Sequence, residues 1–306
     1  MMTTATIRRL SPAALALLLA LWCAGSTAFD WPRMAYRVER DVVYGRGYVQ
    51  KPGAVGQYEL RDLKFDLVAP RGKALQPRMG LVLIHGGSFE GGDKGEGHIQ
   101  ALACALARRG IVCFVMNYRL SGEFPPAPEP YAPDPLKAAG HAAIVDAKVL
   151  LRHVQAHAAS LGVDRNRIVI GGESAGAITA LGAGLSDPDQ FACDLPGLPV
   201  PEMNHPGVTP KPKAIVNLWG MADLFLELFS PGDPPIMTVH GGKDFTVGLS
   251  LMPAETIKAA CEKNGIPNVY YPVKEAGHGV WDINVDGKDL AGLVESFLDK
   301  YVQKQN

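Results

Sequence analysis

The sequence predicts an α/β fold, in which a mostly parallel sheet carries helices on both faces. Continuous apolar runs such as residues 79–84 (MGLVLI) and 111–118 (IVCFVMNY) are typical of strands buried on both sides. Segments with helical spacing separate such runs from residue 79 to the end. This alternation predicts parallel strands joined by crossover helices.

The predicted elements follow one another along the chain. Residues 36–68 have a strand-like pattern interrupted at Pro52-Gly53, which predicts two or more antiparallel strands at the start of the sheet. After these we expect strands at 79–84, 111–118, 167–171, 214–219, 235–241 and 268–273, and helices at 99–110, 137–161, 175–184, 253–264 and 288–303. No repeat or linker divides this series, so residues 29–306 are expected to form a single domain.

The composition limits the classes of function. The chain has 306 residues, of which 47% are hydrophobic, which is enough for one large core. Its net charge of −1 gives no indication of a nucleic acid or an anionic membrane as partner.

The first 28 residues form a separate segment. Arg8 and Arg9 precede an apolar run at residues 10–22, and Ser26-Thr27-Ala28 supplies small residues of the kind that a signal peptidase requires. This predicts a signal peptide cleaved after Ala28 and a secreted or periplasmic protein without membrane contact after cleavage. An uncleaved anchor is the alternative, but the apolar run is short for a membrane span.

Export would leave four cysteines in an oxidising compartment. Cys104 and Cys113 lie in apolar runs, where a buried free thiol is the alternative to a disulfide. Cys193 lies in a Pro-rich loop, and its candidate partner is Cys261. Four cysteines allow three pairings, and the spacing does not choose among them.

Ser174 is the candidate nucleophile. The segment GESAG, residues 172–176, fits G-x-S-x-G and lies between a predicted strand and a predicted helix, as a nucleophile elbow requires. Gly172 and Gly176 remove side chains that would collide in such a sharp turn. The alternative is a serine that only caps the helix, and such a cap does not require glycine at positions 172 and 176.

A serine hydroxyl needs a base, and the base needs an acid that orients it. The expected order along the chain is serine, then acid, then histidine. His278 is therefore the candidate base, because it lies in a Gly-flanked loop after a predicted strand near the C-terminus. Asp244, in the turn after residues 235–241, is the candidate acid. Asp223, after the preceding strand, is the competing acid.

The segment HGGSFEGGDK, residues 85–94, follows a buried strand and predicts an oxyanion hole. We assign its backbone donors to Gly86 and Gly87, with Ala175 as the third. A phosphate-binding loop is the alternative, but no Gly-Lys-Ser/Thr follows the glycines.

Other residues have weaker assignments. Ser88, Phe89, Trp219 and Trp281 are candidates for the substrate pocket, although packing explains the aromatic residues equally well. His153 and His157 are one helical turn apart, a spacing that can bind a metal. Without HExxH or a third ligand in view, we expect a solvated helix face, no metal and no cofactor.

Five motifs together carry a family resemblance: HGGSFEGGDK (85–94), NYRL (117–120), DRNRIVIGGESAG (164–176), HGGKD (240–244) and GHGVW (277–281). With these motifs the chain resembles the α/β-hydrolase carboxylesterases over residues 60–300. It is most similar to the HGGG-type group of hormone-sensitive-lipase-like, feruloyl and acetylxylan esterases. The resemblance implies an eight-stranded, mostly parallel sheet and a serine esterase that acts through an acyl-enzyme. It also implies the roles given above to Ser174, Asp244, His278, Gly86 and Gly87.

The chain departs from that pattern in two ways. Ser88 stands where the third glycine of HGGG is usual, so its side chain is expected beside the oxyanion loop. No sequence for a large cap domain is present, which favours short-chain or carbohydrate- and aromatic-linked esters over emulsified fats. A serine peptidase of the same fold and an inactive binding module are the alternatives to an esterase.

Overall fold

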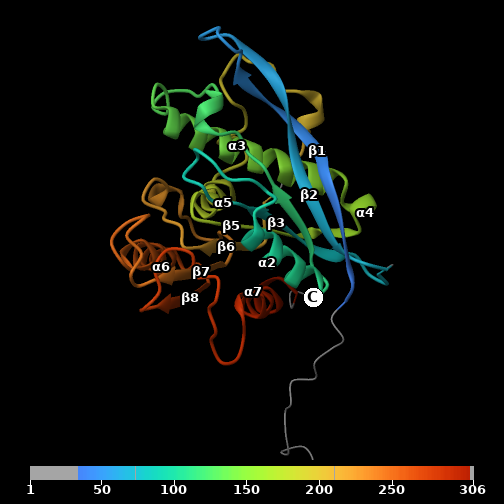
Figure 1. The fold of residues 1–306 in the computed structure, drawn as a ribbon, viewed down its shortest axis with the longest axis vertical. Helices are drawn as coiled ribbons and strands as arrows, with labels where there is room; N and C mark the ends of the chain where they lie inside the picture. The colour runs from blue at the N-terminus through green and yellow to red at the C-terminus, as the bar shows by residue number, and fades with distance from the viewer. Residues whose placement is uncertain (1–33, 73, 210, 304–306) are drawn as a thin grey trace, which may run out of the picture. The chain divides into compact units, whose positions relative to one another are not determined.

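An eight-stranded sheet forms the centre of the computed structural model, which describes residues 34–72, 74–209 and 211–303 (Figure 1). The strand order is β1-β2-β4-β3-β5-β6-β7-β8. The strands are β1 (Tyr36–Gln50), β2 (Tyr58–Pro70), β3 (Arg78–Ile84), β4 (Val112–Met116), β5 (Val163–Glu173), β6 (Ile215–Leu218), β7 (Ile236–Gly241) and β8 (Asn268–Val273). β2 is antiparallel to β1 and β4, and all other neighbours are parallel. The predicted fold class is confirmed.

Helices fill most connections between the parallel strands. They are α2 (Gly97–Ala107), α3 (Pro135–Ala156), α4 (Ala158–Leu161), α5 (Ala175–Leu185), α6 (Met252–Asn264) and α7 (Leu290–Leu298). Short turns are η1 (Ser121–Glu123), η2 (Glu202–Asn204), η3 (Leu226–Leu228) and the π-helical η4 (Asp299–Gln303).

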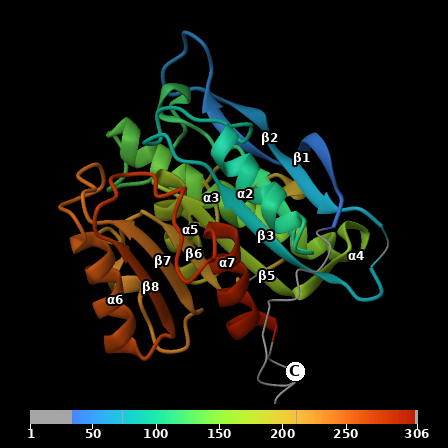
Figure 2. The ribbon, with the colours of Figure 1, turned by 60° about the horizontal axis from the view of Figure 1, so that its bottom comes forward.

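Alternate side chains of β3 enter two separate cores. Val82 and Ile84 pack with residues of α3, α5 and α6, whereas Leu81 and Leu83 pack with residues of α2 and α7. Figure 2 shows α2 and α7 on the same face of the sheet. All four β3 residues are fully buried, as the continuous apolar run predicts.

The helix predicted for residues 137–161 differs at both ends. It begins at Pro135, because the Asp134 carboxylate accepts the N–H groups of Leu136 and Lys137 as a cap. It then breaks at His157, and the short α4 ends at Gly162, which has φ +70°.

The expected Cys193–Cys261 disulfide is wrong, because all four cysteines of the described chain are free thiols. Cys261 faces the core next to α3 and α5, whereas Cys193 lines a surface pocket with Arg152. The predicted signal peptide, residues 1–28, lies outside the described residues. Within them, no helix has both the length and the apolar character that crossing a bilayer requires.

Arg119, from the NYRL motif, is a buried charge that joins distant segments. Its Nη2 donates to Asp146 Oδ1 and to Asp194 Oδ1 at 2.6 Å each, and its Nη1 donates to the Tyr48 carbonyl at 2.9 Å. Burial would lower the pKa of Arg119, but the two carboxylates raise it, so the guanidinium stays charged. The cluster ties α3 to β1 and to the loop that follows α5.

We predict that Arg119→Met destabilises the fold by about 3–5 kcal/mol, because it leaves two carboxylates buried without their cation. Urea unfolding followed by circular dichroism measures this change. The control is Arg46→Met, since the Arg46–Asp62 pair is about half exposed, and its loss should cost less than about 1 kcal/mol. Equal losses in the two variants would contradict the assigned role.

His141 of α3 is buried next to this cluster. Its ring packs against Tyr131 and Phe191, and its Nδ1 has no hydrogen-bond partner in the described part of the chain. Burial lowers the pKa of His141 to about 4, below the ordinary 6.5. The folded protein therefore keeps this imidazole neutral in a pH range where the unfolded chain protonates it.

Acidification should therefore destabilise the protein through His141. Between pH 6.5 and pH 4 the unfolded state binds the additional proton, which removes up to about 1.4 kcal/mol of stability per pH unit. The free energy of unfolding, measured with urea, should fall between pH 7 and pH 5 in the unmodified protein. The fall should be about 1–2 kcal/mol smaller in His141→Leu. The same loss in both proteins would show that His141 titrates alike in the folded and unfolded states.

Candidate active site

Ser174 occupies a strained turn between β5 and α5. Its φ of +53° and ψ of −121° lie outside the regions that non-glycine residues usually adopt. Its N–H donates to the Leu218 carbonyl at 3.0 Å, which fixes the turn at the end of β6. The serine lies at the carboxyl edge of the sheet, where loops from neighbouring strands meet.

The two glycines of the motif are required by close backbone contacts. A Cβ on Gly172 would lie 2.5 Å from the Gly176 carbonyl and 2.7 Å from the Ile84 oxygen. A Cβ on Gly176 would collide with the carbonyls of Ile84 and His85. The start of α5 therefore packs directly against the end of β3.

Three side chains predicted from the sequence lie in line. Ser174 Oγ is 2.9 Å from His278 Nε2, and His278 Nδ1 is 2.7 Å from Asp244 Oδ2. His278 follows β8 and Asp244 follows β7, so adjacent strand ends deliver them. The competing acid, Asp223, is exposed, and no described hydrogen bond links it to His278.

The environment of Asp244 includes a residue that the sequence analysis did not select. Asp244 is 1% exposed and accepts the Thr246 N–H at 2.9 Å. His240 Nε2 lies 3.6 Å from its Oδ2, and burial lowers the pKa of His240. A neutral ring therefore covers the carboxylate on the side of β7. The motif HGGKD contained this histidine four residues before the aspartate.

The oxyanion loop differs from the expectation at Gly86. The Gly86 N–H donates to Glu173 Oε1 at 2.6 Å, so assigning it as an oxyanion donor was wrong. The next three residues have positive φ: Gly87 at +105°, Ser88 at +56° and Phe89 at +62°. No hydrogen bond joins the N–H of Gly87, Ser88 or Ala175 to another described residue. These three groups are the available donors near Ser174.

Glu173, which the sequence motifs do not single out, holds several parts of the site together. One carboxylate oxygen accepts Gly86 N–H, and the other accepts Trp219 Nε1–H at 3.1 Å. Tyr118 supports the loop from the opposite side, because its hydroxyl donates to the Gly86 carbonyl at 3.0 Å and its ring stacks on His85. The position of Glu173 directly before the nucleophile was the available indication.

The four pocket candidates divide into two kinds. Trp219 is fully buried and therefore cannot line an open pocket; it anchors Glu173 and packs edge-on against Trp281. Ser88 is exposed, and Phe89 and Trp281 are half-buried, so these three remain available to a ligand. Phe89 packs against Tyr118.

The site contains no group of metal ligands. Where the structure describes the chain, three or more potential ligands come within reach of one another only at His153, His157 and His205. None of these belongs to the Ser174 site, whose chemistry is that of a serine, an imidazole and a carboxylate.

Comparisons with known sequences agree with this chemistry. Residues 65–228, more than half of the chain, match the BD-FAE family model. Secreted lipase 4 of Gibberella zeae is 30% identical over 154 residues, which are 49% of this chain and 27% of that protein. Fumonisin B1 esterase of Sphingopyxis macrogoltabida is 32% identical over 129 residues, which are 40% of this chain and 23% of that protein. The match thus spans about a quarter of the length of these relatives.

Solved structures share the fold. Thermogutta terrifontis esterase 2, phosphorylated by paraoxon, superposes with a TM-score of 0.62 and 23% identity, covering 86% of this chain and 94% of its own. A truncated carbohydrate esterase from gut microbiota gives a TM-score of 0.63 and 16% identity, and the match covers 89% of this chain and 98% of that one. At these identities the likeness concerns the fold, and the family follows from the sequence match. The chain belongs to the BD-FAE family of α/β-hydrolase esterases.

Proposed function

We propose that the chain is a serine carboxylic-ester hydrolase in which Ser174 is the nucleophile, His278 the base and Asp244 the acid. The alignment of these side chains at 2.9 Å and 2.7 Å carries the proposal. The family membership supports the ester as the bond that is cleaved.

In the first half of the reaction, Ser174 Oγ attacks the ester carbonyl and its proton passes to His278 Nε2. Asp244 accepts the Nδ1–H of His278, which fixes the tautomer and stabilises the imidazolium. The N–H groups of Gly87 and Ala175 bind the developing oxyanion, with Ser88 in place of Gly86 as the third donor.

The tetrahedral intermediate then collapses, because the ester C–O bond breaks as His278 gives its proton to the leaving alcohol, and this first half leaves an acyl-enzyme on Ser174. Water then attacks the acyl carbonyl while His278 again acts as base. The acid leaves and the serine is restored.

The walls of the site favour short-chain or carbohydrate- and aromatic-linked esters. Between β6 and β7 the only regular element is the three-residue turn η3, so this connection contributes no helical cap domain. Exposed Ser88 and half-buried Phe89 and Trp281 offer a polar and aromatic rim. The esterase 2 structures with propionate and butyrate bound indicate the acyl lengths with which to begin.

We also propose that the protein acts outside the cytoplasm. The charged start, apolar run and small residues of positions 1–28 support this location. One relative is itself named a secreted lipase.

Ser174→Ala should abolish catalysed hydrolysis of p-nitrophenyl esters, with kcat falling by about 10⁴ or more. The residues from Phe29 onward are assayed with acetate to laurate esters, and the rate should be highest at short chains. The control is Ser160→Ala, an exposed serine at the end of α4, which should retain the original rate.

A rate unchanged by Ser174→Ala, together with no labelling of Ser174 by a fluorophosphonate, would replace the esterase with a binding module. Labelling of Ser174 with faster cleavage of amides than of esters would favour a peptidase. A maximum at laurate would contradict the open short-chain site.

The two candidate acids provide a matched pair of variants. Asp244→Asn should lower kcat by about 10⁴, because an amide at this position favours the wrong histidine tautomer. Asp223→Asn should leave kcat within about twofold, since Asp223 is exposed and the hydrogen bond of His278 Nδ1 goes to Asp244. Steady-state kinetics on p-nitrophenyl acetate measure both variants, and the reverse order of effects would reassign the acid.

A further inference from the structure

Three histidines from two distant segments meet at the end of α3. His153 and His157 belong to the helix and its cap, and His205 follows η2 in the loop after α5. One ring nitrogen from each can be chosen so that all three lie within 4.8 Å of one another. The sequence supplied the first two at helical spacing, and the fold supplies the third.

The His157 ring is oriented by a backbone carbonyl. His157 Nδ1 lies 3.0 Å from the His153 carbonyl, so it carries the proton and leaves the Nε2 lone pair free. Histidine ligands of metals usually donate their second nitrogen to a carbonyl or carboxylate in this manner.

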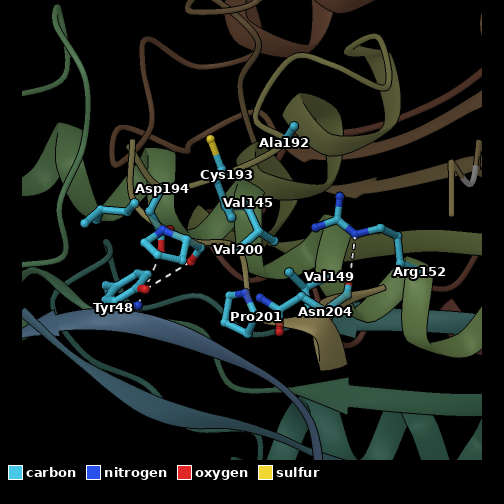
Figure 3. Close-up of a pocket in the computed structure, with 12 residues that line it drawn as sticks. Tyr48, Val145, Val149, Arg152, Ala192, Cys193, Asp194, Val200, Pro201 and Asn204 are labelled. Carbon is cyan, nitrogen blue, oxygen red and sulfur yellow. Dashed lines mark hydrogen bonds between the residues drawn. The ribbon is translucent and has the colours of Figure 1, made fainter. Parts of the chain in front are cut away.

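The position of His205 is fixed by its neighbour. The Asn204 side chain forms two hydrogen bonds with the backbone of Arg46, each 2.8 Å long, which join η2 to β1. Arg152 of α3 donates to the Asn204 carbonyl at 3.0 Å (Figure 3). His205 itself has φ +49°, so its backbone is held in the left-handed region. The third ring is therefore presented by a segment tied to both β1 and α3.

We propose that His153, His157 and His205 form a binding site for one divalent transition-metal ion of the zinc class. The group consists of imidazoles alone, which suit zinc, copper and nickel, whereas magnesium and calcium require oxygen ligands. Three ring nitrogens leave a fourth tetrahedral position for water, and exposed His157 provides access from solvent.

The site lies away from Ser174, and its role is structural. Phe89, in the loop with the candidate oxyanion donors, packs near Gly140 in the first half of α3, and His153 follows about 20 Å further along the helix. A bound ion would cross-link the end of α3 to the loop that also carries Asp194. It would stabilise the folded protein without entering the proposed hydrolysis.

Isothermal titration of chelator-treated, tag-free protein with zinc chloride tests the site. We expect one Zn²⁺ per chain and a rise in Tm of about 5 °C when zinc is present at 100 times Kd. Cobalt(II) should give the visible absorption of a tetrahedral complex. His157→Gln and His205→Asn should each weaken zinc binding by about tenfold or more. Asparagine is chosen at 205 because it tolerates a positive φ.

The control is His98→Gln, which removes an exposed histidine outside the cluster and should bind zinc as the unmodified protein does. Circular dichroism without metal verifies that each variant is folded. His157→Gln should perturb packing least, because His157 is exposed. Absence of stoichiometric binding in the unmodified protein would overturn the proposal. Equal affinity in His157→Gln and His98→Gln would also overturn it.

Discussion

The contact between the start of α5 and the end of β3 is the constraint on which the site depends. Gly172 and Gly176 approach the Ile84 carbonyl so closely that neither can carry a side chain. The chain between them has to turn sharply, and Ser174 takes the unfavourable backbone conformation that this turn imposes. The same contact places the oxyanion loop, which continues from Ile84, beside the serine. One steric condition thus sets both the candidate nucleophile and its candidate donors.

Hydrogen bonds that a single carboxylate accepts connect further strand ends to this turn. Glu173 joins the oxyanion loop at Gly86 to the buried indole of Trp219, which follows β6. Three strand ends are therefore connected directly behind Ser174. A loop with three successive positive φ values would be costly on its own. Bonds of Gly86 with Glu173 and Tyr118 hold its start, and the Ser121 N–H donates to the Phe89 carbonyl at its end.

Much of this was predictable from the sequence because the relevant patterns are local. Apolar runs and helical spacing gave the strand and helix series, and the chain order selected Ser174, Asp244 and His278, which the fold brings together. What was missed depends on contacts between distant segments. Glu173 and His240 lie inside motifs that the sequence shows, but their contacts are set by the fold, and His205 has no local pattern that distinguishes it. Gly86 matched the motif, but its N–H direction is decided by a carboxylate 87 residues away. The disulfide expectation failed because spacing says nothing about which cysteines face the core.

The lack of a helical cap between β6 and β7 has a consequence for how this chain could acquire new substrates. Where a mobile cap selects substrates, exchanging the cap changes selectivity while the catalytic framework is left alone. Here the proposed rim around Ser174 belongs to loops that also carry the candidate oxyanion donors and His278, such as residues 85–94 and 277–281. Selectivity and catalytic geometry are thus encoded in the same short segments. New substrates would then be acquired by single side-chain replacements at the rim, each under the restraint that the backbone must not move.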